Sequence, residues 1–191
     1  MLGDITKRVD TGEFDEFVAL PENSDRNFEL VDGEIVEKMV SGPVSSRLGL
    51  RMGRFIDAFV DAYDLGQVSG ADGGYWVGDD RYIPDVAYIS KAKLIHVAKY
   101  GYVMTTPDLA VEVISPTDEK NNISTKIVNY LAAGTVLWLV DPKDQSVKVC
   151  EPNKPMVRFT RNMTLKGGRV LPNFTLDLEL LFKIMDEPII E

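Results

Sequence analysis

Two residue types that build many active sites are almost missing from this chain of 191 residues, which has one cysteine, Cys150, and one histidine, His96. A single cysteine allows no disulfide within the chain, which suits a reducing compartment. One histidine and one cysteine are also too few to form the sets of three or four histidine and cysteine ligands that hold zinc. A Ser-His-Asp triad would have to use His96, in KLIHVAK, where no nucleophile-elbow motif accompanies it. Any metal ion would therefore need oxygen ligands, which favours magnesium, manganese or calcium.

Long apolar runs and an excess of basic residues are lacking as well. No segment approaches the roughly 18 apolar residues of a membrane span, and the start, MLGDITKRVDTGEF, lacks the pattern of a secretory signal. We therefore expect a cytoplasmic protein with no membrane partner. The net charge of −9, from 21 basic and 30 acidic residues, argues against purely electrostatic binding of nucleic acid. The net charge still allows nucleic acid to bind at a local basic face.

The residue periodicity predicts an α/β fold. Alternating residues around Asp32-Gly33 in FELVDGEIVEKM predict a hairpin, and apolar residues at helical spacing predict a helix from Pro43 to about Tyr63. A strand, a helix at 123–133 and a second strand predict a crossover over 108–140. We also expect a short helix over 12–20 opened by Thr11, three strands ending with one at 83–90, a short helix and loop at 91–106, and a final meander. A mixed sheet flanked by helices follows, in a single domain over 1–191 with its core at about 13–182.

One acidic residue stands out in this pattern. The strand segment PDLAVEVISPT is almost wholly apolar, which predicts a strand buried on both faces, yet it contains Glu112. A buried carboxylate without a partner costs several kcal/mol. Glu112 is therefore expected to be paired with a cation, neutralised, or bound to a metal.

Two other residues point to the same place. Asp85 follows Pro84 at the start of a predicted neighbouring strand, so its carboxylate and that of Glu112 can converge as oxygen ligands of Mg²⁺ or Mn²⁺. The backbone carbonyl of Val113 is a candidate further ligand. Lys126, in the following helix, has apolar helical neighbours, which directs its ammonium towards the sheet. There it can position an attacking water and offset charge on a phosphate.

Pro84-Asp85, then Glu112, then a lysine resembles the signature of the PD-(D/E)XK nucleases. In the common form the lysine lies two residues after the acid, where this chain has Ile114. A lysine moved to the next helix, as Lys126 is, resembles one group of that superfamily, the Uma-two family of proposed endonucleases. The resemblance covers about Glu13 to Phe182 and includes FELVDGEIVEKM, IPDVAYIS, PDLAVEVISP, KIVNYLAAG, LWLVDP and LPNFTLDLELLF.

The resemblance implies a restriction-endonuclease-like fold and Mg²⁺-dependent hydrolysis of DNA phosphodiester bonds. It assigns metal binding to Asp85 and Glu112 and the activation of water to Lys126. The chain departs from the family pattern at Ser45, where relatives often have histidine, and at Asn122, where they tend to have aspartate. Asparagine caps a helix about as well as aspartate, but it cannot replace a metal ligand or a tuning charge.

Several residues are accessory candidates. Glu34 is a possible third carboxylate, although a solvated strand position is the alternative. Ser115 and Asn122 are expected to satisfy backbone groups where the strand leaves the sheet. Three arginines on one helix face are possible phosphate contacts, with a solvated stripe as the alternative: Arg47, Arg51 and Arg54.

The sequence supports two hypotheses about function. The first is a metal-dependent endodeoxyribonuclease with Asp85, Glu112 and Lys126 at its centre, for which RNA remains an alternative substrate. Cutting both strands symmetrically needs two active sites, so this hypothesis includes a homodimer. The second is a catalytically inactive module on the same fold that binds nucleic acid or a protein partner.

Overall fold

A six-stranded mixed sheet forms the centre of the protein in the computed structural model, which describes residues 8–96, 101–115 and 123–186. Only one neighbouring pair in it, β7 with β8, is parallel, and the other pairs are antiparallel. The spatial order of its strands is β10 (Val157–Thr160), β9 (Ser146–Cys150), β8 (Val136–Asp141), β7 (Leu109–Val113), β6 (Val86–Ser90) and β3 (Gly66–Ser69).

Two smaller antiparallel sheets accompany it. The first has the order β2 (Glu34–Glu37), β1 (Phe28–Val31), β5 (Asp80–Tyr82) and β4 (Tyr75–Val77). The second pairs β11 (Thr164–Lys166) with β12 (Thr175–Asp177). The predicted hairpin is confirmed as β1–β2. Its turn needs two residues with positive φ, and Asp32 and Gly33 supply φ values of 50° and 80°.

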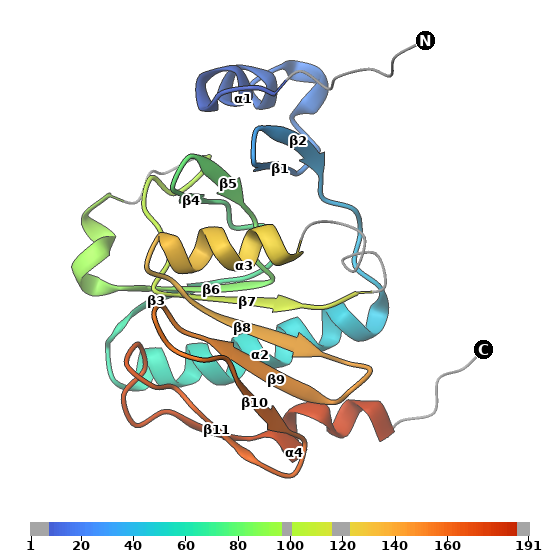
Figure 1. The fold of residues 1–191 in the computed structure, drawn as a ribbon, viewed down its shortest axis with the longest axis vertical. Helices are drawn as coiled ribbons and strands as arrows, with labels where there is room; N and C mark the ends of the chain where they lie inside the picture. Colours follow the sequence, from blue (N-terminus) through green and yellow to red (C-terminus); the bar gives the residue numbers. More distant parts are fainter. Residues whose placement is uncertain (1–7, 97–100, 116–122, 187–191) are drawn as a thin grey trace.

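Helices cover both faces of the central sheet (Figure 1), as the sequence predicted. The α-helices are α1 (Thr11–Val18), α2 (Pro43–Ala62), α3 (Ile123–Ala132) and α4 (Leu178–Phe182), and the short 3-10 helices are η1 (Pro21–Asn23), η2 (Lys91–His96) and η3 (Lys183–Asp186). α2 lies on one face and α3, which connects β7 to β8, on the other (Figure 1). Of the helices in the described ranges, none has the length and apolar character that crossing a membrane requires.

The alternation of side chains along β7 divides the core into two. Val111 and Val113 pack with Leu48 and Met52 of α2 in the larger cluster. Ala110 belongs to the cluster on the opposite face, which includes Tyr130 and partly buried residues of α3. Because successive side chains of a strand point to opposite faces, Glu112 shares the α3 face with Ala110. The glutamate is thus buried beneath a helix.

Three local predictions need correction. α1 is capped by Asp10, whose side chain accepts a hydrogen bond from the Glu13 backbone, so Thr11 is the first helical residue and not the cap. The strand expected over 83–90 begins at Val86, because Pro84 has no backbone N–H to donate. The preceding strand, β5, was not predicted, since three residues are too few to show a period.

Candidate active site

Glu112 lies near the carboxyl end of β7 and is 8% exposed. The hydroxyl of Tyr130 donates a hydrogen bond to its Oε1 atom over 3.2 Å. Burial raises the pKa of Glu112 to about 7; the neighbouring ammonium of Lys126 opposes this rise, while the carboxylates of Glu29 and Asp85 add to it. The isolated acid of PDLAVEVISPT is therefore both paired and partly neutralised.

Asp85 lies across from Glu112. Val86 faces Val111 in the antiparallel β6–β7 pair, so one step further along the two chains brings Asp85 opposite Glu112. The backbone N–H of Val113 donates to Oδ2 of Asp85 over 2.8 Å. The backbone hydrogen bonds between β6 and β7 end at Val86, and the side chain of Asp85 accepts the next N–H of β7. This bond keeps the carboxylate of Asp85 close enough to Glu112 to raise its pKa.

Lys126 reaches the same place from α3, as its apolar neighbours predicted. Its Nζ atom is 3.5 Å from Oε1 of Glu112 and lies 5.3 Å from the centre of the Tyr82 ring. A closer contact, 2.7 Å, joins it to Oε2 of Glu29 in β1. The structure therefore brings together the three residues that the sequence selected, and it adds a third carboxylate.

Glu29 is the residue that the sequence analysis missed. It is 5% exposed, and its Oε1 atom accepts the backbone N–H of Ile83 over 2.8 Å. It thereby ties β1 to the segment that carries Asp85 and fixes one side of the Lys126 ammonium. A signal was present, because Glu29 is the only acid within the apolar run FELV, just as Glu112 is within LAVEV.

A second ammonium, that of Lys38, also contacts the site. Lys38, just after β2, donates to the carbonyl of Ile83 over 2.5 Å, and its Nζ atom lies 3.4 Å from Oδ1 of Asp85. Its side chain is 18% exposed. This contact could not be predicted from the sequence, because a lysine that follows a hairpin is normally solvated.

The accessory candidates lie at different distances from this centre. Glu34 is exposed at the start of β2, and the carboxylate that the hairpin brings to the site is that of Glu29. Ser115 is half-buried just after β7, and Asn122 lies outside the described residues. For Val113 the contact that the structure shows is made by its backbone N–H. Its carbonyl as a metal ligand stays a prediction.

A cavity of about 540 Å³ adjoins Asp85 between α2 and the end of β3. Ser45, where the chain departs from the expected family pattern, lines it together with Arg54. Arg47 is exposed on the same helix. Arg51 is instead directed to α4, where it donates to the carbonyl of Leu180 over 2.5 Å. The arginine stripe is thus divided between the cavity, the surface and helix packing.

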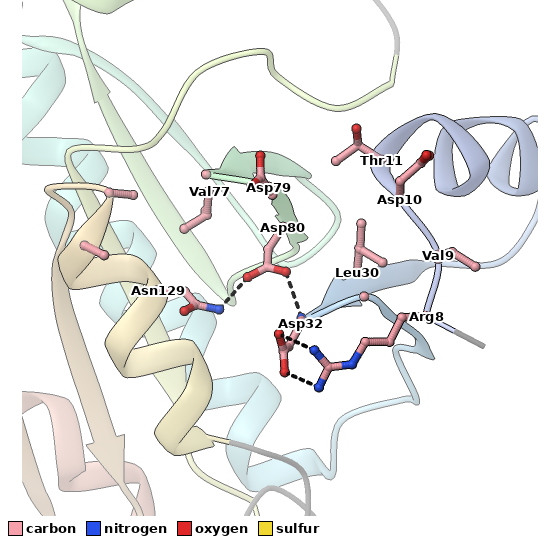
Figure 2. Close-up of a pocket in the computed structure, with 14 residues that line it drawn as sticks. Arg8, Val9, Asp10, Thr11, Leu30, Asp32, Val77, Asp79, Asp80 and Asn129 are labelled. Carbon is pink, nitrogen blue, oxygen red and sulfur yellow. Dashed lines mark hydrogen bonds and ion pairs between the residues drawn. The ribbon is translucent and has the colours of Figure 1, made fainter. Parts of the chain in front are cut away.

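A second cavity, of about 670 Å³, lies between the N-terminal segment, the four-stranded sheet and α3 (Figure 2). Its most buried acid, Asp80, is 7% exposed and accepts hydrogen bonds from the backbone of Asp32, the hydroxyl of Tyr82 and the side chain of Asn129. Asn129 is one turn beyond Lys126 on α3. Asp80 therefore fastens the helix that carries Lys126 to the smaller sheet.

The residues of the site fit a hard divalent cation. Three carboxylates, from Glu29, Asp85 and Glu112, face two ammonium groups, from Lys38 and Lys126. Repulsion from the carboxylates of Glu29 and Asp85 contributes to the raised pKa of Glu112. A bound cation would relieve this repulsion. Among the described residues, no group of three or more His, Cys, Asp and Glu side chains is arranged to hold one ion. Mg²⁺ commonly binds through only one or two carboxylates, with water and substrate phosphate completing its shell.

A solved structure shares the fold of this chain. A crystal structure described as a "putative nuclease belonging to DUF820", from Anabaena variabilis, matches this chain with a TM-score of 0.76 and 22% sequence identity. The match covers 88% of this chain and 96% of that one. The two proteins therefore share a fold, as the predicted likeness to a nuclease implied.

The family follows from a second comparison. The model of the Uma2 family, described as "Putative restriction endonuclease", matches residues 14–179. The chain belongs to this family, which confirms the resemblance that the motifs carried. No curated protein matches the chain significantly.

Proposed function

We propose that this protein is a Mg²⁺-dependent endonuclease that hydrolyses DNA phosphodiester bonds. One observation carries the proposal: the carboxylate of Asp85, just before β6, and that of Glu112, in the neighbouring strand β7, lie near the ammonium of Lys126 from the next helix. Family membership and the nuclease-like fold support the same conclusion. Mn²⁺ is the alternative cation.

Asp85 and Glu112 would hold the cation, which when bound supplies charge neutralisation at the phosphate and acidifies water. Lys126 can orient a water molecule or stabilise negative charge on the phosphate. Glu29 keeps the ammonium of Lys126 in place through its 2.7 Å contact. The cavity beside Asp85 leaves room for the substrate, with Arg54 as a phosphate contact.

The test begins with Mn²⁺ binding, measured by calorimetry on the wild type and on Asp85→Asn. Binding that is lost in Asp85→Asn supports the site, and the same variant should then lose Mg²⁺-dependent cleavage of plasmid DNA. Asp141→Asn is the matched control, because Asp141 is also partly buried and faces a lysine, Lys148, at 3.7 Å on another part of the sheet. Equal binding by the wild type and Asp85→Asn would contradict the assignment.

A non-catalytic binding module is the second candidate. The observation that favours it is that the described residues include no three-ligand cluster for a metal ion. In that case the wild type binds neither Mn²⁺ nor Mg²⁺ at millimolar concentration, even with DNA present, and Asp85→Asn leaves DNA binding unchanged.

Symmetric cutting of a duplex belongs to the proposal as well. Two active sites are needed to cut both strands at one position, so we propose a homodimer as the active form. Sedimentation of the protein with and without duplex DNA measures this. A monomer that makes only single-strand nicks would restrict the proposal to a nicking enzyme.

A further inference from the structure

Lys38 contacts the carboxylate oxygen of Asp85 that β7 does not. Of the two carboxylate oxygens, Oδ2 accepts the backbone N–H of Val113, whereas Oδ1 faces the ammonium of Lys38 at 3.4 Å. The same ammonium donates to the carbonyl of Ile83. Two oxygens from the segment before β6 thus already surround one positive charge.

The place taken by this ammonium is chemically suited to a divalent cation. Carboxylate and carbonyl oxygens are the ligands that hard cations prefer. An ammonium and a divalent ion bound to the same carboxylate repel each other strongly at separations of a few ångströms, and a partly buried site screens that repulsion only in part. The two cations are therefore alternatives at Oδ1 of Asp85.

The backbone around Lys38 allows the exchange. The N–H of Lys38 bonds to the carbonyl of Asn27, which anchors the residue at the end of the hairpin. The next residues, 39–42, are exposed and connect β2 to α2. The side chain of Lys38 is 18% exposed and is therefore partly in contact with water. It can leave Asp85 without disturbing either strand.

We propose that Lys38 is an internal counter-ion that competes with the divalent cation for Asp85 and so weakens metal binding until substrate is present. This inference rests on the proposed function. Substrate phosphate supplies negative charge that favours the divalent ion and also offers the released ammonium a new partner. Metal binding and phosphate binding are thereby coupled through one lysine side chain.

The test is the affinity for Mn²⁺ in the absence of nucleic acid, measured by calorimetry on the wild type, Lys38→Met and Lys38→Arg. Methionine keeps most of the apolar stem and removes the charge. We expect Lys38→Met to bind Mn²⁺ roughly ten- to a hundredfold more tightly than the wild type. Lys38→Arg should stay within about threefold of the wild type, because the charge remains.

Lys148→Met is the matched control, since Lys148 faces Asp141 at 3.7 Å with 28% of its side chain exposed. It should leave Mn²⁺ affinity unchanged. A second measurement allows for a change in the stability of the variant itself. The rise in melting temperature that Mn²⁺ causes should be larger for Lys38→Met than for the wild type.

The outcomes separate this inference from the proposed function. If the wild type and Lys38→Met bind Mn²⁺ equally, and Asp85→Asn abolishes binding, the counter-ion role is wrong and the metal site stands. If Lys38→Met binds more weakly than the wild type, Lys38 supports the site and does not compete. If neither protein binds Mn²⁺ with or without DNA, the metal-dependent function and the inference both fail.

Discussion

At the scale of single residues, the site is a cluster of charges that the fold holds against their mutual repulsion. Glu112 is the clearest case, since burial and two neighbouring carboxylates make its ionised form unfavourable. If the side chain at position 112 only had to fill space in the core, an apolar residue of similar size would make the fold more stable. The carboxylate of Glu112 therefore has a cost in stability, and the metal-binding role proposed for it accounts for a charged group at this position.

The first prediction concerns that cost. The pKa of Glu112 is about 7 in the folded protein and 4.5 in its ordinary state, so the folded form retains the proton more strongly. The free energy of unfolding from this residue consequently falls as pH rises from about 4.5 to about 7. Glu112→Gln removes the penalty and should be more stable than the wild type at pH 8, by up to about 3 kcal/mol, with little difference at pH 4.5. Urea unfolding at the two pH values measures this.

Glu37→Gln is a control for the Glu112 experiment, because the pKa of Glu37 is shifted in the opposite direction. Arg26 donates hydrogen bonds to Glu37 and lowers the pKa of that carboxyl, so its ionised form is favoured in the fold. Glu37→Gln should therefore be no more stable than the wild type at pH 8. If Glu112→Gln is the less stable protein at pH 8, then the pair with Lys126 stabilises the fold and the cost argued here is wrong.

At the scale of elements, the position of α3 decides where the Lys126 ammonium lies. The hydrogen bonds of Asp80 connect α3 through Asn129 to β5 and to the turn of the β1–β2 hairpin (Figure 2). β1 also carries Glu29, the closer partner of Lys126. The smaller sheet and α3 are thus joined both through Asn129 and through Lys126.

The second prediction tests this connection. Asp80→Ala leaves three donors without their acceptor and should lower the free energy of unfolding by about 2–4 kcal/mol. Asp79→Ala, an exposed neighbour in the same cavity, should change it by no more than about 0.5 kcal/mol. Guanidinium unfolding of the three proteins gives the comparison. A loss as small as that of Asp79→Ala would mean that Asp80 does not fasten α3.

The elements also show how far the sequence could predict the structure. Periodicity was enough for the hairpin, for α2 and for the strand–helix–strand unit over β7, α3 and β8, because each buries a regular apolar face. Pairing between distant strands has no such signal. The acid within FELV marks Glu29 as unusual, but its role in the site could not be predicted, because that role depends on β1 lying beside β5 and near Lys126, which is 97 positions away along the chain.

At the scale of the whole molecule, the excess of acidic charge limits how DNA can be bound. The net charge is −9, so a polyanion is repelled by most of the surface and attracted only locally. Three cationic residues suit this role: Lys38 contacts Asp85, Arg54 lines the adjoining cavity, and Arg47 is exposed on the same helix as Arg54. Three phosphate contacts are few for a nucleic-acid-binding protein.

The third prediction follows from that number. For B-DNA the logarithm of the binding constant falls with the logarithm of salt concentration by about 0.9 for each phosphate neutralised, so three contacts give a slope of about −3. Fluorescence anisotropy with a labelled duplex and the Asp85→Asn variant measures the slope without cleavage. Arg54→Gln should reduce it by about one. A slope steeper than about −6 would indicate a wider basic face than these residues provide.

The contacts of Lys126 have a consequence for how the protein reaches its working state. Glu29 enters the ribosomal tunnel 97 residues before the lysine that it pairs with, and β7 can form its parallel pair only after α3 and β8 have been made. Non-local pairings of this kind form late, because the connecting chain must first be closed into a loop. A nascent chain therefore cannot assemble the charge cluster before α3 has been made, and any activity that depends on the cluster begins only when folding is nearly complete.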